Sequence, residues 1–467
     1  MATYRPSNET ELRTMIGYWD DSGGSRVAGT ANAVGDIVEL PASTITATGA
    51  DRVLSLKPGV HLIGAGVDSS ILSGFGFRLI GSGGASEASG IGRFTLDIDG
   101  LAAAAAGASS AFGGAVIEDA SFASYQWKVT NSTATAGGNN LTLVSTSGNS
   151  AVEGLLDSPT VTDSDSDCLS TKGGGATGNA STLYRVFNGT INEPGTAGND
   201  QAVTPHEGVL VELYGGSIAG NSSGGNVAYA QAIDGDQRTD ALLYNVTITG
   251  EVVATGAQLH GCLVNMATDD KLENPSVLRD TRIVATGTDT VDTLVFLNSN
   301  GGNLDIDRVD IQSGGSGSGL KEISGYTGSI TANDLLVTDS YRGFDVRQST
   351  GHTLTDSVLQ ATQYGVLAAS SNVTLSNVKS DASTLGTPIG SVTTEDPLLA
   401  ATISAKRDAV NVGGATQPAI TDGWSGAVLA AYEVLQAGGG NLSFGLDFNL
   451  SSDLHRSLDI IPTPNYL

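Results

Sequence analysis

Acidic and basic side chains gather in two short segments near the middle of the chain. Asp234, Asp236 and Arg238 occupy every second position of one segment, and His206 and Glu207 lie in an earlier one. Carboxylates, imidazoles and guanidinium groups are the side chains that transfer or stabilise protons in catalysis, so this set could form an acid–base site. A structural alternative stays open, because Asp-Gly and Gly-Asp pairs favour turns in which the aspartate bonds to the local backbone.

A second group of carboxylates has the alternating spacing of a calcium loop. Asp163, Asp165 and Asp167 would supply its oxygen ligands, but Cys168 stands where the loop needs glycine and Gly174 where it needs a bidentate glutamate. A specific site of this kind is therefore not expected. The prediction is that no cofactor is required and that these carboxylates bind calcium or other cations loosely, from a medium of high salt.

Composition narrows the classes of function. The 467 residues include 49 acidic and 22 basic residues, for a net charge of −27, so the chain lacks the Lys/Arg stripes that bind nucleic acid. No window approaches the roughly 18 consecutive apolar residues of a membrane span. The N-terminus lacks the charged and apolar regions of a secretory signal. Cys168 and Cys262 are expected to point into the core, and whether they form a disulfide stays open.

The types of charged residue indicate the medium in which the protein works. Only seven of the 22 basic residues are lysine, and aspartate outnumbers glutamate. A surface rich in carboxylates and poor in lysine stays hydrated in concentrated salt, where self-repulsion is screened. This composition resembles that of proteins from extreme halophiles. An ordinary acidic surface that supports solubility is the alternative.

Short strand-like runs recur along most of the chain. Runs that begin at Ile306, Ile330, Leu354 and Leu375 follow one another at offsets of 24, 24 and 21 residues. Such a period predicts a solenoid of stacked coils, with alternate small apolar side chains in a narrow bore and Gly, Asn or Asp at the corners. We therefore expect an all-β fold, a parallel β-helix. A β-sandwich array is the rival, but hairpin signals such as Asn-Gly are scarce.

One stretch carries a family resemblance. The run Arg52-Val-Leu-Ser-Leu-Lys-Pro-Gly-Val-His-Leu-Ile-Gly-Ala-Gly66, followed by Ser70-Ile-Leu-Ser-Gly74, resembles the opening coils of the pectate-lyase-like right-handed β-helix superfamily. Asn372-Val-Thr-Leu-Ser-Asn377 is similar to its later coils, and the resemblance spans residues 35–392. The family includes polysaccharide lyases, hydrolases, epimerases and non-enzymatic virus spikes, so the resemblance implies the fold more specifically than the activity.

The resemblance also implies where a site would lie. In the family's enzymes, the catalytic carboxylates and basic residues lie on the outer face of stacked strands. His206 and Glu207 would then lie one coil before Asp234, Asp236 and Arg238. The aligned aspartates and Gly-His-Gly of polygalacturonase-type hydrolases are missing, as is the Arg-x-x-Pro-x-x-Arg pattern of pectate lyases.

The two ends depart from the repeat. Asn8 and Glu11 form a capping-box-like start, which predicts an amphipathic helix over residues 9–20 that closes the first coil. A second helix is expected at residues 426–436. The expected organisation is a helical cap at residues 1–34, a β-helix at 35–392, and a C-terminal cap or oligomer-contact segment at 393–467.

These features favour a virus particle as the place of action. β-Helices commonly form tail spikes, fibres or capsid-surface projections, which assemble in the host cytoplasm without a secretion signal. We expect a structural virion protein of a tailed virus of a halophilic host, a homotrimer that contacts other virion proteins and a host surface glycan or glycoprotein. The first alternative is a polysaccharide lyase or glycoside hydrolase that uses the acid–base set on the same scaffold. The second is a cellular surface protein that is exported by an unrecognised route.

Overall fold

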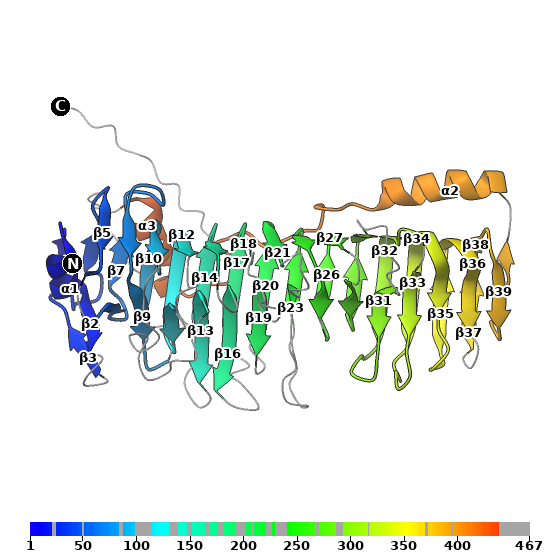
Figure 1. Ribbon diagram of the computed structural model, residues 1–467, viewed down its shortest axis with the longest axis horizontal. Helices are drawn as coiled ribbons and strands as arrows, with labels where there is room; N and C mark the ends of the chain where they lie inside the picture. Colours follow the sequence, from blue (N-terminus) through cyan, green and yellow to red (C-terminus); the bar gives the residue numbers. More distant parts are fainter. Residues whose placement is uncertain are drawn as a thin grey trace, which may run out of the picture.

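The computed structural model describes most of the chain up to residue 438. Left out are residues 21–24, 49–50, 84–86, 99–113, 131–138, 147–151, 165–167, 175–181, 193–201, 207–209, 221–226, 229–240, 254, 268–269, 286–292, 316, 369–371, 394–395 and 439–467. The described residues form 40 strands and three helices. Figure 1 shows the strands stacked side by side along one long axis, as the repeat predicted. The fold is a parallel β-helix.

Each coil contributes up to three strands, and equivalent strands of successive coils pair in parallel to form three faces. The first face contains β1 (Thr3–Tyr4), β4 (Ile37–Glu39), β7 (His61–Ile63), β10 (Ala88–Asp97), β12 (Ser121–Thr130), β14 (Glu153–Asp157), β17 (Leu183–Phe187), β20 (Leu210–Tyr214), β23 (Ala241–Tyr244), β26 (Gln258–His260), β29 (Val277–Arg279), β32 (Leu304–Gln312), β34 (Ile330–Asp345), β35 (His352–Thr355) and β37 (Val373–Ser376).

The second face adjoins the first around a tight corner. It contains β5 (Thr44–Thr46), β8 (Ile71–Ser73), β15 (Thr160–Thr162), β18 (Thr190–Asn192), β21 (Ser217–Ala219), β24 (Thr247–Thr249), β27 (Leu263–Met266), β30 (Arg282–Ala285), β36 (Val358–Ala368), β38 (Val378–Ser380) and β40 (Val392–Thr393). Long strands such as β10, β12, β32 and β34 bend at the corner and belong to both faces.

The third face closes the triangle. It contains β6 (Val53–Leu56), β9 (Gly76–Ile80), β11 (Ala115–Glu118), β13 (Leu141–Thr146), β16 (Leu169–Gly174) and β19 (Val203–His206), and in the later coils β22 (Val227–Ala228), β25 (Val252–Val253), β28 (Leu272–Glu273), β31 (Thr293–Leu297), β33 (Ser318–Glu322) and β39 (Ser383–Gly386). The C-terminal parts of β34 and β36 complete it.

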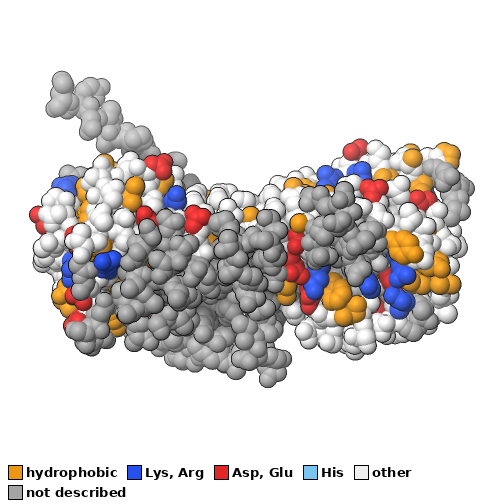
Figure 2. Space-filling view, in the orientation of Figure 1, with side chains coloured by type: hydrophobic (Ala, Val, Ile, Leu, Met, Phe, Trp, Pro, Cys, Tyr) orange, Lys and Arg blue, Asp and Glu red, His pale blue; other side chains and the backbone are white. Residues whose placement is uncertain are grey.

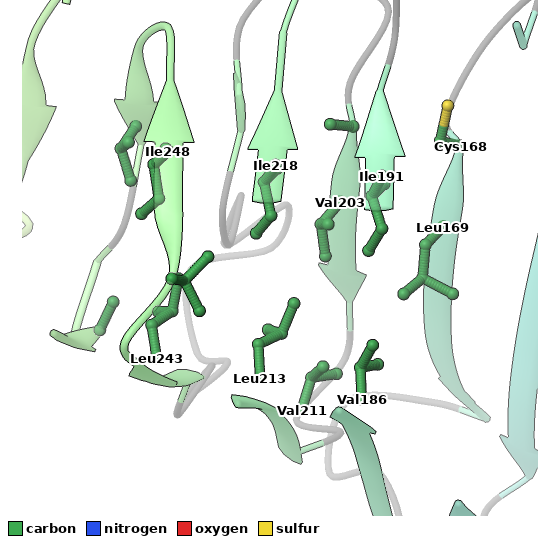
Figure 3. Packing of buried hydrophobic residues seen from close by; sticks show 14 of the residues in the cluster. Cys168, Leu169, Val186, Ile191, Val203, Val211, Leu213, Ile218, Leu243 and Ile248 are labelled. Carbon is green, nitrogen blue, oxygen red and sulfur yellow. The ribbon is translucent and has the colours of Figure 1, made fainter. Parts of the chain in front are cut away.

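The bore is filled by inward-pointing side chains of the three faces. Figure 3 shows Ile191, Ile218 and Ile248 from successive coils in one row of the interior. Cys168 and Cys262 are both buried and free, which confirms their expected role as small core side chains. Because each coil places a similar side chain above the last, stacking buries a continuous apolar column.

Positive-φ residues form the corner between the first and second faces. Asn188, Asn245, Asp280, Asp356 and Asn377 have φ between 48° and 58°. Asn and Asp tolerate this left-handed conformation better than other residues with a Cβ, which explains why they end the strand-like runs of the sequence.

The predicted coil register was wrong by two residues at two of its three steps, because Ile330 does not lie in the same column as the other three residues. Ile306 pairs with Ala332, and Ile330 pairs with Leu304. Leu354 pairs with Ala332 instead of Ile330, and only the pairing of Leu354 with Leu375 agrees with the prediction. A shift of two residues keeps the same side chains on the inward face, so the alternating pattern does not reveal it.

The N-terminal end carries the predicted helix in a shorter form. α1 (Glu9–Ile16) is capped by Asn8, whose side chain accepts a hydrogen bond from the backbone N–H of Glu11. The helix ends at Gly17, where φ is 91°, and not at residue 20. The chain continues as β2 (Gly17–Asp20), which pairs antiparallel with β3 (Ser25–Ala28) and β6.

The segment after β40 runs back along the outside of the solenoid. α2 (Asp396–Ala409) lies along the C-terminal half, and α3 (Gly426–Gln436), which has the predicted bounds, lies against β10 and β12 near the other end (Figure 1). We call residues 396–438 the strap. None of the described helices is long and apolar enough to cross a membrane. The expected division at residues 34 and 392 stays a prediction, as does the capping role of residues 393–467.

Candidate functional site: the outer face and its strap

The predicted acid–base set falls almost entirely outside the described residues. Glu207, Asp234, Asp236 and Arg238 are in segments that the structure does not describe, and His206 is described only as the last backbone position of β19. β23 follows residue 240 directly, so the segment that holds the two aspartates leads into the first face. The acid–base site therefore stays a prediction.

The predicted calcium loop is described only at its start. Asp165 and Asp167 lie outside the described residues. Asp163 has a φ of 59°, and its carboxylate accepts hydrogen bonds from the hydroxyls of Thr130 and Thr162, both at 3.1 Å. The bond from Thr130 joins one coil to the next. Among the described residues, no three His, Cys, Asp or Glu side chains are grouped so that they could hold a metal ion.

Four rings stack along the outside of the first face. Phe187, Tyr214, Tyr244 and His260 occupy one register column, on β17, β20, β23 and β26. Successive ring centroids are 5.0, 5.2 and 4.7 Å apart, with interplanar angles of 17°, 19° and 9°. We call these four residues the ring ladder. Because each ring face covers the next, the ladder ties four coils together from outside the bore.

Charged groups surround the buried part of the ladder. The Glu212 carboxylate accepts hydrogen bonds from Arg185 Nε at 2.5 Å and from the Tyr214 hydroxyl at 2.7 Å. Burial and the bond to Glu212 both raise the pKa of Tyr214. The hydroxyl therefore stays a proton donor, and the carboxylate is held in place by two donors.

The other end of the ladder is partly open to solvent. Tyr244 and His260 are half-buried, and the pKa of His260 is lowered by burial and by the positive charge of Arg279. Arg279 in turn forms an ion pair with Asp305 at 2.7 Å. The imidazole is therefore neutral near pH 7.

The strap covers the buried end of the ladder. Trp424 packs in the same apolar cluster as Phe187 and Tyr214, and the Arg185 guanidinium lies 5.1 Å from the centroid of the Trp424 ring. Arg185 also donates a hydrogen bond to the Asp422 carbonyl oxygen at 2.8 Å. Arg185 thus joins the ladder, Glu212 and the strap.

α3 is docked by apolar packing and by two hydrogen bonds. Its buried side chains are Val428, Ala431, Tyr432, Val434 and Leu435, and they pack against outward apolar side chains of the first face, namely Ile37, Ile63, Ala88, Ala123 and Leu155. The Tyr432 hydroxyl donates to the Asp157 carboxylate, and the backbone N–H of Ser425 donates to Glu153 at 2.9 Å. Outward apolar residues on β4, β7, β10, β12 and β14 are thereby removed from water.

α2 is docked mainly by ion pairs. Lys406 pairs with Asp334, and Arg407 Nε lies 3.7 Å from the carboxylate of Asp310, which also pairs with Arg282 at 3.0 Å. Burial, which is the largest effect, raises the pKa of Asp310, and the two arginines oppose that rise. The apolar contribution is small, with Leu399 and the half-buried Ile403 packed against Leu336 and Val358.

Between the helices, the strap bonds to corner residues. The Asn245 side-chain amide donates to the carbonyl oxygen of Ala415 and accepts from its N–H, both at 2.9 Å. The N–H of Gly413 donates to the carbonyl oxygen of Gly261 at 2.7 Å. The left-handed corner of the solenoid thus presents polar groups that the extended strap uses.

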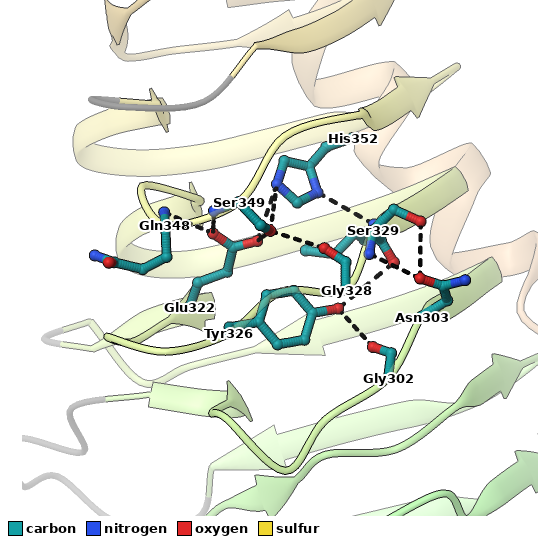
Figure 4. A network of polar contacts seen from close by, with 10 residues as sticks. Gly302, Asn303, Glu322, Tyr326, Gly328, Ser329, Gln348, Ser349 and His352 are labelled. Atoms are coloured by element: carbon teal, nitrogen blue, oxygen red, sulfur yellow. Dashed lines mark hydrogen bonds and ion pairs between the residues drawn. The ribbon is translucent and has the colours of Figure 1, made fainter.

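A buried network resembles a nucleophilic triad in its residue types but not in its arrangement (Figure 4). His352 Nε2 lies 2.9 Å from Glu322 Oε1, and Ser349 Oγ lies within hydrogen-bonding distance of both side chains. His352 Nδ1 accepts from the backbone N–H of Ile330 at 3.1 Å. The serine hydroxyl and the carboxylate therefore both contact Nε2 of His352. In a catalytic triad the nucleophile and the carboxylate contact different ring nitrogens of the histidine.

The network holds coils together and has no access for a substrate. The Glu322 and His352 side chains are both 0% exposed. Burial, the largest effect, raises the pKa of Glu322, but bonds from His352, from the Gln348 N–H and from Ser349 together lower it below its ordinary value. Glu322 is thus a charged group inside a corner, stabilised by donors from the next coil.

A small pocket lies beside the third face. Its volume is about 190 Å³, and it is lined by Pro58, Gly81, Ser82, Gly83, Glu87, Asp119 and Ala120. Glu118, the preceding neighbour of Asp119, has a raised pKa because of burial and of the Asp119 charge, which the Arg78 charge opposes. The pocket therefore has two carboxylates in its lining, Glu87 and Asp119, and the carboxyl group of Glu118 is next to Asp119 in sequence.

These features were not found from the sequence because their spacing is irregular. The members of the ring ladder are 27, 30 and 16 residues apart, so no fixed period connects them. One sequence signal could have identified the ring ladder. A large ring recurs just before a corner Asn or Gly, as in Tyr214, Tyr244 and His260.

Comparisons with known proteins give one likeness. No family model matches the chain, and no curated protein matches it. Among solved structures, the chain is similar to the A-module of the mannuronan C-5 epimerase AlgE6 from Azotobacter vinelandii, at 14% identity over 76% of this chain and 91% of that one, with a TM-score of 0.29. At this identity and TM-score, the likeness carries no argument about activity.

Proposed function

We propose that this chain is a structural protein of a virus particle, a capsid-surface projection or a tail spike or fibre of a tailed virus that infects a halophilic host. The observation that supports it most is the use of side chains outside the bore. The ring ladder joins coils to one another, and Arg185, Asp310 and Asp157 join coils to the strap. Such bracing stiffens an elongated solenoid, which suits a load-bearing or display element.

The charge of the chain supports the same proposal. Figure 2 shows acidic and basic side chains beside one another on the C-terminal half of the rod, where the ion pairs of Arg308, Arg342 and Arg347 lie. The remaining excess of acid, −27 for the whole chain, keeps the surface hydrated when salt is concentrated. As part of the proposal, the protein acts as a homotrimer, contacts other virion proteins and touches a host surface glycan or glycoprotein through its outer face.

The test is the location of the protein. Particles released by lysis are purified in molar salt, and the chain is detected by peptide mass spectrometry and by immunogold labelling in electron micrographs. We expect gold on the head surface or tail of intact particles. Recovery of the chain only from the soluble fraction of lysed cells, with unlabelled particles, would overturn the proposal.

A second candidate is a polysaccharide lyase or glycoside hydrolase. The pocket beside Asp119 favours it, because Glu118, whose pKa is raised, and a neighbouring carboxylate are the residue types that acid–base cleavage of a glycan uses. Asp234 and Asp236 are the other pair to test. If the chain is such an enzyme, Glu118→Gln with Asp119→Asn, or Asp234→Asn with Asp236→Asn, abolishes release of oligosaccharides from host glycan, while Asp68→Asn at an exposed site does not. A wild-type chain that releases none excludes cleavage of the glycans tested.

A further inference from the structure

The last coil of the solenoid has strand edges that are paired on one side only. β39 pairs with β36, and β40 pairs with β38; within the described residues neither has a second neighbour. Ile389 lies between them and bonds backward to the preceding coil, to Val373 and Leu375, at 2.6 Å each. We call residues 382–393 the end face. Its outer edge presents backbone N–H and carbonyl groups that another strand can pair with.

Large apolar side chains are exposed on and beside this edge. Leu385 is 49% exposed and Ile389 is 60% exposed. Leu398, which is 53% exposed, lies in the first turn of α2, at the same end of the rod (Figure 1). Exposed apolar residues grouped at a strand edge mark a surface that gains from being covered.

The end face is also free of charge. Residues 382–393 contain no Asp, Glu, Lys or Arg, in a chain whose net charge is −27. Two copies approaching through most of their surface would repel each other, because like charges would face one another. The end face itself adds no charge to this repulsion, so a second copy of the chain is a suitable occupant.

The opposite end of the rod does not offer a matching surface. α1 and the antiparallel strands β2 and β3 lie there, with Arg13 paired to both Glu9 and Asp51. A contact between unlike ends would place the neutral strand edges against this charged helix. A contact between like ends places one uncharged strand edge against another. Such a contact has two-fold symmetry, so the assembly is complete when two copies have joined.

We propose that the end face binds the end face of a second copy, strand edge to strand edge. Two solenoids are then joined through their C-terminal ends. A two-fold axis across the contact makes the paired edges antiparallel, and Leu385 and Ile389 of each copy are then removed from water. This inference goes beyond the proposed place in a virus particle and holds wherever the protein acts. The joined rods form a straight element of about twice the length of one chain.

The experiment measures mass and length of the full chain in solution. Light scattering after size exclusion, in 2 M salt, is expected to give an even multiple of the 47.2 kDa chain mass, namely two chains, or six if each of the joined rods is the homotrimer proposed above. The double variant Leu385→Lys with Ile389→Lys is expected to halve that mass and to reduce the maximum dimension in small-angle scattering by nearly half. Val34→Lys, which changes an equally exposed apolar residue near the other end, should change neither quantity.

Folding of the variants is checked separately. Circular dichroism melting of the single variant Ile389→Lys and of the double variant should match that of the wild type, because both side chains point to solvent in one copy. A wild-type mass that is an odd multiple of the chain mass, a mass unchanged in the double variant, or a halved mass without shortening would each overturn the proposal. So would a monomeric wild type that dimerises only after removal of residues 439–467, since that segment would then be the occupant.

Discussion

The hydroxyl group of Tyr432 on α3 donates a hydrogen bond to the carboxylate of Asp157 on β14, which lies 275 positions earlier in the chain. Asp157 is only 4% exposed and accepts a second hydrogen bond, from the Ser158 hydroxyl. The contact therefore anchors the end of the strap near the start of the solenoid. A segment that begins at the last coil thus becomes a brace along most of the rod.

Removing the Tyr432 hydroxyl should release α3 without unfolding the coils. In Tyr432→Phe the apolar packing remains, but the buried Asp157 carboxylate loses a donor, which costs about 1–3 kcal/mol of docking free energy. Hydrogen exchange in residues 426–436 should then accelerate about tenfold or more, while exchange in β12 and β14 stays unchanged. Mass spectrometry of the exchanged peptides measures both.

Tyr341→Phe is the matched control, because Tyr341 is 40% exposed and lies far from α3 in the last third of the solenoid. Exchange in α3 should match the wild type in this variant. Equal exchange of α3 in wild type and Tyr432→Phe would show that apolar packing alone holds the helix.

Salt should loosen α2 and leave α3 in place. The ion pairs of Lys406 and Arg407 involve side chains 20% and 37% exposed, and pairs of this kind contribute up to about 1 kcal/mol and are screened by salt. α3 is held mainly by apolar contacts, which salt does not weaken. Raising NaCl from 0.2 to 2 M should accelerate exchange in residues 396–409 up to about fivefold, relative to residues 426–436. A uniform change in the two helices would contradict the difference in docking.

The ring ladder should contribute to stability as a stack of rings more than through its hydroxyl groups. Tyr214→Ala opens a gap between Phe187 and Tyr244 and should lower the free energy of unfolding by about 3–5 kcal/mol. Tyr214→Phe keeps both stacking contacts and loses only the bond to Glu212, at about 1–2 kcal/mol. Guanidinium unfolding followed by circular dichroism compares the two. Similar losses in both variants would place the stabilisation in the hydroxyl bond and not in the stack.

The fold could be predicted from local patterns that repeat. Alternation of small apolar and polar residues, with Asn or Asp where φ must be positive, indicated stacked coils, and Asn188 and Asn377 do occupy such corners. The bounds of α3 were also evident from its apolar spacing and the glycines after it. The register between coils could be predicted less well, because a shift of two residues, as at Ile306, leaves the same alternation of inward and outward side chains.

The placement of the strap could not be predicted from the sequence. Pro397 and weak amphipathicity hid α2, whose position depends on ion pairs such as Arg407 with Asp310. Arg185 and Asp157, the long-range partners of Trp424 and Tyr432, lie more than 200 residues earlier, and no local pattern encodes a contact over that separation. The acid–base set was chosen from residue types alone, and residues 229–240, which hold most of it, lie outside the described structure.

The buried carboxylate of Glu322 should make the last third of the solenoid sensitive to acid. Its folded-state pKa lies below the ordinary value of 4.5, so its stabilising effect is fully present above about pH 4.5 and is lost as the pH falls through the lower folded value.

In Glu322→Gln, an NH₂ group replaces one of the two carboxylate oxygens. Oε2 accepts from two backbone N–H groups and Oε1 accepts from His352, so the NH₂ group faces a donor in either orientation of the amide. The variant should lose about 1.5–3 kcal/mol at pH 7. Denaturant unfolding at pH 7 and pH 3.5 should show this gap shrinking, because below about pH 4.5 the unfolded wild type takes up a proton that folded Glu322 binds less readily. Glu39→Gln, at the pair with the exposed Arg5, should lose little stability at pH 7, and a Glu322→Gln gap that does not change with pH would contradict the charged state assigned to Glu322.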